Sequence, residues 1–185
     1  MSSPRDIVVL VGSLRKESFT RKMAKAVMEL LPETTRGTIV EIGDLPFYNQ
    51  DDEPNPPAQW LAFRDRVRKC DGVLFFTPEY NRSVPSVLKN AIDVGSRPPG
   101  KSAWDNKPAA IVSVSPGAMG GFGANHHLRQ SLVALNVPTL PAPEAYIGGV
   151  AKLFDENGKL INDDTRAFLQ KFVNAYAALV ERNTT

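Results

Sequence analysis

The chain has 185 residues, and its shares of hydrophobic (42%) and charged (23%) residues are ordinary for a globular protein, which excludes a disordered chain. Its length fits one domain, residues 1–185, around a single extended core. The formal net charge of +2 and the lack of a long basic run argue against a nucleic-acid partner.

Along the chain, short apolar runs alternate with segments whose apolar residues have the spacing of a helix. Most of the runs are continuous, as expected for strands buried on both faces of a parallel sheet. Five strands are predicted, the second being the weakest, over residues 7–11, 38–42, 73–76, 109–114 and 145–147. Apolar residues at helical spacing predict five helices, over residues 23–31, 60–70, 84–92, 128–135 and 168–180. The candidates for capping the last helix are Asp163, Asp164 and Thr165.

This alternation of strands and helices predicts an α/β fold. Right-handed crossovers give a three-layer sandwich with a five-stranded parallel sheet in the order 2-1-3-4-5. Ligands of such sheets bind beyond the carboxyl ends of the strands, so function is expected in the loops after the first, third and fourth strands. Residues 51–57 and 97–107 are expected to be surface loops near those strand ends.

The loop after the first strand, residues 12–20, is predicted to bind a phosphate. It places hydroxyls and a guanidinium at the start of a helix, where unpaired N–H groups and the helix dipole stabilise an anion. Ser13, Ser18 and Thr20 can add hydrogen bonds, and Arg15 can add a charge-assisted one. The loop lacks the glycine spacing of ATP-binding and dinucleotide-binding motifs, so a mononucleotide fits better. An ordinary βα turn with a serine cap is the alternative.

The loop after the third strand, residues 77–85, is expected to be stiff. Pro78 keeps the residue before it extended, Ser83 is a candidate helix cap, and the first turn of the following helix tolerates Pro85. Rigid backbone donors and acceptors suit the polar edge of a flat heteroaromatic ring, with Tyr80 available for stacking. The alternative is a merely solvated turn.

The loop after the fourth strand, residues 113–121, is rich in glycine. Glycine lets the backbone approach a bound ring closely. Glycine-rich loops join many strands to helices, so this loop alone is weak evidence for a ligand. A ligand site is expected because three such loops meet at one edge of the sheet.

Other candidates for chemistry have simpler explanations. His126 and His127 are adjacent on a helix and point in different directions, so packing or an interface is expected rather than a metal site. Residues 51–53 are acidic but lack the glycine of a calcium loop, so a solvated tip is expected. Cys70 is the single cysteine of the sequence, so an internal disulfide is excluded and a reducing, cytoplasmic location is favoured. Its side chain is expected to pack in the core rather than to act as a reactive thiol. The first apolar run, residues 7–11, is too short for a signal peptide or a membrane span, so no membrane partner is expected.

At these loops the sequence resembles the NAD(P)H-dependent FMN reductase family of flavodoxin-like proteins, and most closely its bacterial chromate and quinone reductase branch. The resemblance rests on three stretches: Gly12-Ser13-Leu14-Arg15-Lys16-Glu17-Ser18-Phe19, then Thr77-Pro78-Glu79-Tyr80-Asn81 continuing through Ser83-Val84-Pro85 and Leu88-Lys89-Asn90-Ala91-Ile92-Asp93, and His127-Leu128-Arg129-Gln130. The second stretch is the most specific. Members of this branch often have an aromatic residue where this chain has Val94-Gly95, a departure that bears on the pocket over the ring.

The resemblance implies one bound FMN, with NADPH or NADH as the electron donor. The residues themselves predict no metal site. The implied phosphate ligands lie within residues 13–20, the ring edge is held by residues 78–81 and Ser115, and Gly117 lies beneath the ring. The implied FMN ligands are Ser13, Leu14, Arg15, Ser18, Phe19, Thr20, Pro78, Glu79, Tyr80, Asn81, Ser115 and Gly117. The resemblance also implies a homodimer or a homotetramer, with residues 51–57, Glu144 and the helix of His126 and Arg129 near the subunit interface.

The implied function is an oxidoreductase in which hydride passes from the nicotinamide to flavin N5 and a small-molecule acceptor then takes the electrons, in a ping-pong reaction. No catalytic side chain is therefore assigned. The candidate acceptors are quinones, free flavins, azo dyes, nitroaromatics and chromate. One alternative is a flavodoxin-type electron carrier, which the near-balanced charge and the arginine in the phosphate loop disfavour. The other is a flavin-binding sensor without turnover.

Overall fold

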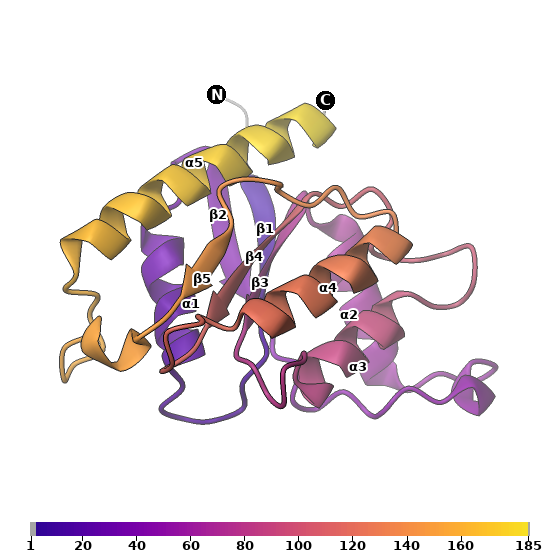
Figure 1. The fold of residues 1–185 in the computed structure, drawn as a ribbon. Coiled ribbons are helices and arrows are strands. Elements are labelled where there is room, and N and C mark those ends of the chain that lie inside the picture. Colours follow the sequence, from indigo (N-terminus) through magenta and orange to yellow (C-terminus); the bar gives the residue numbers. More distant parts are fainter. Residues whose placement is uncertain (1–2, 185) are drawn as a thin grey trace.

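A computed structural model describes residues 3–184 as a sheet with helices on both of its faces (Figure 1). Within this part of the chain, the strands are β1 (Arg5–Val11), β2 (Thr35–Ile39), β3 (Gly72–Thr77), β4 (Ala109–Val114) and β5 (Ala145–Ile147). The α-helices are α1 (Phe19–Glu29), α2 (Ala58–Lys69), α3 (Ser86–Gly95), α4 (Phe122–Ala134) and α5 (Asp163–Thr184), and short 3-10 helices cover Gln50–Asp52 and Val150–Lys152. All strand pairs are parallel and the order is β2-β1-β3-β4-β5, so the predicted flavodoxin-like fold is confirmed.

The sheet is covered on both faces, because successive side chains of each strand point to opposite sides. One set, which includes Val9 and Leu74, packs with α1 and α5. The other set, which includes Val8 and Phe75, packs with α2, α3 and α4. Figure 1 shows the same division, with α1 and α5 on one side of the sheet and the other three helices opposite. None of the helices in residues 3–184 has the length and apolar character needed to cross a membrane.

The second strand lies three residues earlier than predicted, at Thr35–Ile39 rather than 38–42. It is an edge strand and its buried and exposed residues alternate, so its apolar pattern is weak. The residues that suggested a later strand, Val40 and Ile42, pack into the cluster beneath α2 and α3 after the strand has ended. The prediction placed the strand too late because the loop after β2 contains buried apolar residues, which have the same sequence pattern as a buried strand.

The third helix begins later than predicted, and Ser83 is not its cap. α3 begins at Ser86, with Pro85 at the N-cap position. The residue before a proline is disfavoured in helical conformation, so the helix starts only after Pro85. Ser83 instead pairs with Tyr80 through backbone hydrogen bonds.

The cap of the last helix is Asn162, one residue before the predicted candidates. Its Oδ1 accepts a hydrogen bond from the Thr165 N–H at 2.8 Å. Asp163, Asp164 and Thr165 therefore lie in the first turn of α5, where the two negative carboxylates interact favourably with the positive end of the helix dipole.

Residues 97–107 are more than a surface loop, because Trp104 within them is fully buried. Its indole N–H donates to the Ile92 carbonyl at 2.8 Å, and its ring lies against Gly95, where an added Cβ would be 2.5 Å from the ring atoms. Val94 is also buried in the core. Both residues of the Val94-Gly95 departure therefore lie in the core, where Gly95 makes room for the Trp104 ring.

Cys70 lies in the core next to the end of α2, as expected. Its Sγ lies 3.1 Å from the Val67 carbonyl oxygen. Burial raises the pKa of the Cys70 thiol, so the thiol stays protonated at neutral pH and is a poor nucleophile.

Candidate functional site

The loops that follow β1, β3 and β4 meet at the carboxyl edge of the sheet, as the topology requires (Figure 1). Two adjoining clefts lie among them, an inner one of about 60 Å³ and an outer one of about 400 Å³. Ser13, Arg15 and Tyr80 line both clefts. A small cleft beside a larger one suits a ligand with a compact polar end and a larger flat end.

The start of α1 supplies the polar groups of the inner cleft. Ser18 is the N-cap of α1, where its Oγ accepts a hydrogen bond from the Arg21 N–H at 3.2 Å and keeps its own proton to donate. Ser13 and Thr20 are also buried and line the same cleft. Arg15 is exposed and makes no hydrogen bond or ion pair with residues 3–184. Because the first N–H groups of a helix have no acceptor within it, amides, hydroxyls and a guanidinium converge on one small space.

A tight turn between β3 and α3 presents Tyr80 to both clefts. Tyr80 and Ser83 exchange backbone hydrogen bonds of 3.1 and 2.9 Å. The two residues between them, Asn81 and Arg82, have φ angles of 49° and 64°, as in a type I′ turn. Positive φ is unfavourable for a side chain as long as that of Arg82, so the surroundings must hold this turn.

The side chain of Glu79 is directed to α4 rather than into the clefts. Its Oε2 accepts a hydrogen bond from the Ala124 N–H at 3.0 Å, and its Oε1 pairs with Arg82 Nη1 at 3.2 Å. Only 13% of the Glu79 side chain is exposed. A flavin contact at this position, as the resemblance implies, would therefore fall to the backbone of Glu79.

The loop after β4 is fixed by hydrogen bonds within itself and to β5. The Ser115 Oγ accepts a hydrogen bond from the Gly117 N–H at 3.0 Å, and the Ser115 N–H donates to the Ile147 carbonyl at 2.9 Å. Gly117 is exposed, and an added Cβ would meet only the Ser115 Oγ, at 3.5 Å. Gly120, with φ of 59°, lies so close to β5 that an added Cβ would be 2.6 Å from the Tyr146 backbone.

Eight of the twelve predicted ligand residues line the two clefts: Ser13, Leu14, Arg15, Ser18, Phe19, Thr20, Pro78 and Tyr80. The other four lie in the adjoining loops without lining either cleft: Glu79, Asn81, Ser115 and Gly117. The sequence did not assign a ligand role to the remaining lining residues, which are Gly12, Pro85, Ser86, Val87, Val114, Pro116 and Val150. Most of these lie in loops already expected to bind a ligand. Val150 lies in the segment after β5, from which no function was expected. Its N–H donates to the Ser115 carbonyl at 3.3 Å.

The chemistry of the two clefts fits the FMN that the resemblance implies. Among the described residues, the inner cleft is lined by the hydroxyls of two serines, one threonine and one tyrosine, by one guanidinium and by no carboxylate, a donor set that matches a phosphate. The outer cleft is lined mainly by apolar groups, including Leu14, Pro85 and Val87, with Tyr80 beside them. Its volume falls within the range of small-molecule sites.

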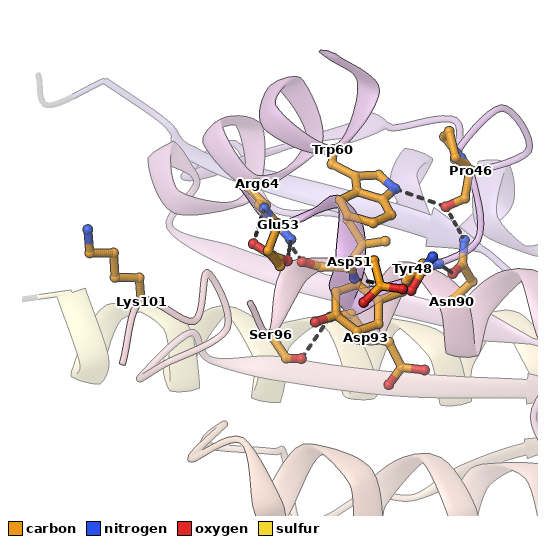
Figure 2. Close-up of polar contacts among 12 residues, drawn as sticks. Pro46, Tyr48, Asp51, Glu53, Trp60, Arg64, Asn90, Asp93, Ser96 and Lys101 are labelled. Carbon is orange, nitrogen blue, oxygen red and sulfur yellow. Dashed lines mark hydrogen bonds and ion pairs between the residues drawn. The ribbon is translucent and has the colours of Figure 1, made fainter. Parts of the chain in front are cut away.

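A long loop between β2 and α2 borders the outer cleft. Gly43 lies against Leu14, since an added Cβ would be 2.8 Å from the leucine side chain. The Pro46 carbonyl accepts hydrogen bonds from Trp60 of α2 at 2.9 Å and from Asn90 of α3 at 3.1 Å. Figure 2 shows both side chains directed at this carbonyl. The loop is thus fastened to two helices.

A buried ion pair between Glu53 and Arg64 holds the far end of this loop. The prediction that residues 51–53 form a solvated tip is therefore wrong for Glu53. Arg64 of α2 is 2% exposed, and its Nη2 lies 2.6 Å from the Glu53 Oε1 (Figure 2). Its Nε donates to the Val94 carbonyl at 2.8 Å, and the guanidinium lies 5.3 Å from the Trp60 ring. The Arg64 charge therefore has a carboxylate, a carbonyl and an aromatic face around it.

The start of α4 carries an aromatic group beside the glycine-rich loop. Phe122, His126 and Tyr146 have ring centroids 4.2–6.0 Å apart, and the Tyr146 hydroxyl lies 3.1 Å from the His126 Nε2. Burial, reinforced by the nearby Glu144 carboxylate, raises the pKa of Tyr146 to about 12, so its hydroxyl stays protonated at neutral pH. Arg129 lies 3.5 Å from the same carboxylate. No three His, Cys, Asp or Glu side chains gather as metal ligands anywhere in residues 3–184.

Comparison with known proteins agrees with this geometry. Residues 5–152 match the model of the family described as NADPH-dependent FMN reductase. A quinone reductase of Pseudomonas putida is 61% identical over 184 residues, covering 99% of this chain and 98% of that protein. A 2-hydroxy-1,4-benzoquinone reductase of a Burkholderia species is 44% identical over 174 residues, covering 94% and 95% of the two chains.

Among solved structures, FerB from Paracoccus denitrificans is similar over the whole fold. It is described as a flavoenzyme NAD(P)H:(acceptor) oxidoreductase. Its TM-score is 0.91 at 38% identity, and the match covers 97% of this chain and 98% of FerB. The resemblance inferred from three stretches of the sequence is thereby confirmed.

We expect Glu53→Ala to lower the free energy of unfolding by about 3 kcal/mol, because it leaves the buried Arg64 charge without its carboxylate. Urea unfolding measures this loss, and limited proteolysis should cut residues 43–57 faster. The control is Asp65→Ala, which breaks the exposed Asp65–Lys69 pair of the same helix and should cost less than about 0.5 kcal/mol. Equal losses in the two variants would contradict the role given to the buried pair.

Proposed function

Because the chain belongs to the NADPH-dependent FMN reductase family, we propose that it binds one FMN at the two clefts and reduces small quinones with electrons from NAD(P)H. The observation that supports this most directly is the convergence of three strand-end loops on a cleft lined by hydroxyls and a guanidinium. The quinone reductases among its relatives support the choice of acceptor.

The inner cleft would hold the phosphate of FMN. Ser13, Ser18 and Thr20 each offer a hydroxyl proton there, and Arg15 offers a positive charge without a competing carboxylate in the cleft. The N-terminus of α1 adds unpaired N–H groups and about half a positive charge. Together these groups favour a dianionic phosphate over an uncharged ligand.

The loops after β3 and β4 would hold the ring of FMN. Pro78 and Tyr80 line the clefts, and the backbones of Glu79, Asn81 and the loop at Ser115 and Gly117 lie beside them. When bound, FMN supplies a ring that accepts a hydride and passes electrons to an acceptor. The task of the protein is to bind the phosphate, orient the ring and leave one face open. This division of work needs no nucleophile or general base from the chain.

The outer cleft would admit the nicotinamide and the acceptor in turn. Leu14, Val87 and Tyr80 give it apolar, flat walls, which select a ligand by shape rather than by many hydrogen bonds. Because both substrates use the same opening, the oxidised nicotinamide must leave before the quinone binds. We therefore expect ping-pong kinetics.

We further infer that residues 1–185 act as one FMN-binding domain in the cytoplasm. The two core clusters pack on opposite faces of a single sheet, which supports one folding unit. The buried, unpaired thiol of Cys70 is consistent with a reducing compartment.

The decisive experiment is a spectrum of the purified protein followed by anaerobic titration. The protein should show flavin absorbance, which NADPH or NADH bleaches and a quinone restores. An apoprotein that takes up no FMN would overturn the proposal. Bound FMN that neither nucleotide reduces would indicate an electron carrier instead.

Arg15→Ala should weaken FMN binding by about 1–3 kcal/mol, the scale of a hydrogen bond to a charged group. Fluorescence titration of the apoprotein with FMN measures the change. The control is Lys25→Ala, which removes one positive charge from the exposed side of α1 and should leave the affinity unchanged. FMN affinity equal to that of the wild type would remove Arg15 from the site.

We also propose that the chain works as a homodimer or a dimer of dimers. Large apolar side chains are exposed near the clefts at Phe47 (76% exposed), Met119 and Phe122, and the last belongs to the same helix as His126 and Arg129. Light scattering should give two or four times the chain mass of 20.3 kDa, and Phe122→Asp should lower that mass. A wild-type mass of one chain at micromolar concentration would contradict the proposal.

A further inference from the structure

We propose that Glu79 is a positioning residue that fixes the FMN cleft by clamping the start of α4 to the turn that carries Tyr80. The proposal rests on the function proposed above. The Glu79 side chain lines neither cleft, so its carboxylate acts through the two walls rather than by touching the cofactor.

The start of α4 has no cap of its own. Its N-cap residue is Gly121, with φ of 76°, and no acidic residue lies in its first turn. Such a helix start leaves N–H groups without acceptors and a partial positive charge without compensation. Glu79 supplies an acceptor and a compensating charge. Its Oε2 accepts a hydrogen bond from the Ala124 N–H at 3.0 Å, and its carboxylate brings a negative charge to the positive end of the helix. The cap thus comes from a residue 45 positions earlier in the chain.

The turn and the helix approach each other too closely for any side chain at position 123. A Cβ added to Gly123 would lie 2.8 Å from the Arg82 carbonyl oxygen and 2.9 Å from the Glu79 Oε2. Arg82 has positive φ, and its Nη1 lies 3.2 Å from the other oxygen of Glu79. The Glu79 carboxylate therefore contacts both the Arg82 side chain of this unfavourable turn and the start of α4, which lies directly against the turn.

This clamp joins two walls of the site. The turn carries Tyr80, which lines both clefts. The loop 115–121 carries Pro116 of the inner cleft and runs directly into α4. Because Gly120 of that loop packs against the backbone of β5, the start of α4 is anchored to the sheet. Glu79 ties the turn to this anchor, so the two walls keep a fixed separation.

The test compares Glu79→Ala and Glu79→Gln in the full chain. Fluorescence titration of each apoprotein gives the dissociation constant of FMN, and visible circular dichroism reports the surroundings of the bound flavin. Glu79→Ala should raise the dissociation constant about fivefold, the scale of one lost helix cap, and change the visible spectrum. Glu79→Gln keeps a carbonyl acceptor for the Ala124 N–H and should restore most of the affinity.

The matched control is Asn162→Ala, which removes the cap of α5. It should lower thermal stability as Glu79→Ala does, yet leave FMN affinity and the visible spectrum unchanged. Glu79→Ala with the wild-type dissociation constant and spectrum, or with no larger effect than Asn162→Ala, would overturn the proposal. A wild-type protein that takes up no FMN would instead show that the proposed function itself has failed.

Gly123→Ala is a second test of the clamp, and it decides the outcome if Glu79→Ala does not fold. The added methyl group should push the start of α4 away from the turn while Glu79 itself is retained, so the FMN dissociation constant should again rise. An unchanged constant in Gly123→Ala would show that the close approach of turn and helix has no bearing on the cofactor site.

Discussion

Burial of the central strands on both faces decides where chemistry can occur in this protein. Every residue of β3 and β4 is buried, and β1 is buried over its last five residues. A parallel sheet enclosed in this way offers no open face to a ligand, so polar groups gather beyond the strand ends. The two clefts, the start of α1 and the clamp at α4 all lie at the carboxyl edge of the sheet for this reason.

The loops at that edge are held by side chains that bond to distant backbone groups. Glu79 bonds to the start of α4, and Asn90 and Trp60 bond to the Pro46 carbonyl. Arg64 bonds to a carbonyl near the end of α3. Loop backbones have few partners of their own, and unpaired buried N–H and C=O groups are costly. These side-chain bonds therefore let loops form the fixed walls of a site.

The sequence by itself determined the number, type and order of the strands and α-helices, and it singled out the loops that line the two clefts. Continuous apolar runs and helical spacing are local patterns. They can be recognised in the sequence because the buried residues of one strand or helix are near one another in the chain. The lining of the inner cleft is equally local, since Ser13, Arg15, Ser18 and Thr20 lie within one turn and the start of one helix.

Only the tertiary structure decided which side chains hold those loops together. The partner of Glu79 lies 45 residues away, Trp104 is buried through a contact with Ile92, and Arg64 pairs with an acidic residue expected to be solvated. β2 was misplaced because an edge strand is half exposed while the loop after it is buried. The physical reason is the same in each case: a contact between distant segments depends on how whole elements pack, and the apolar pattern of one segment does not say which distant residue it will meet.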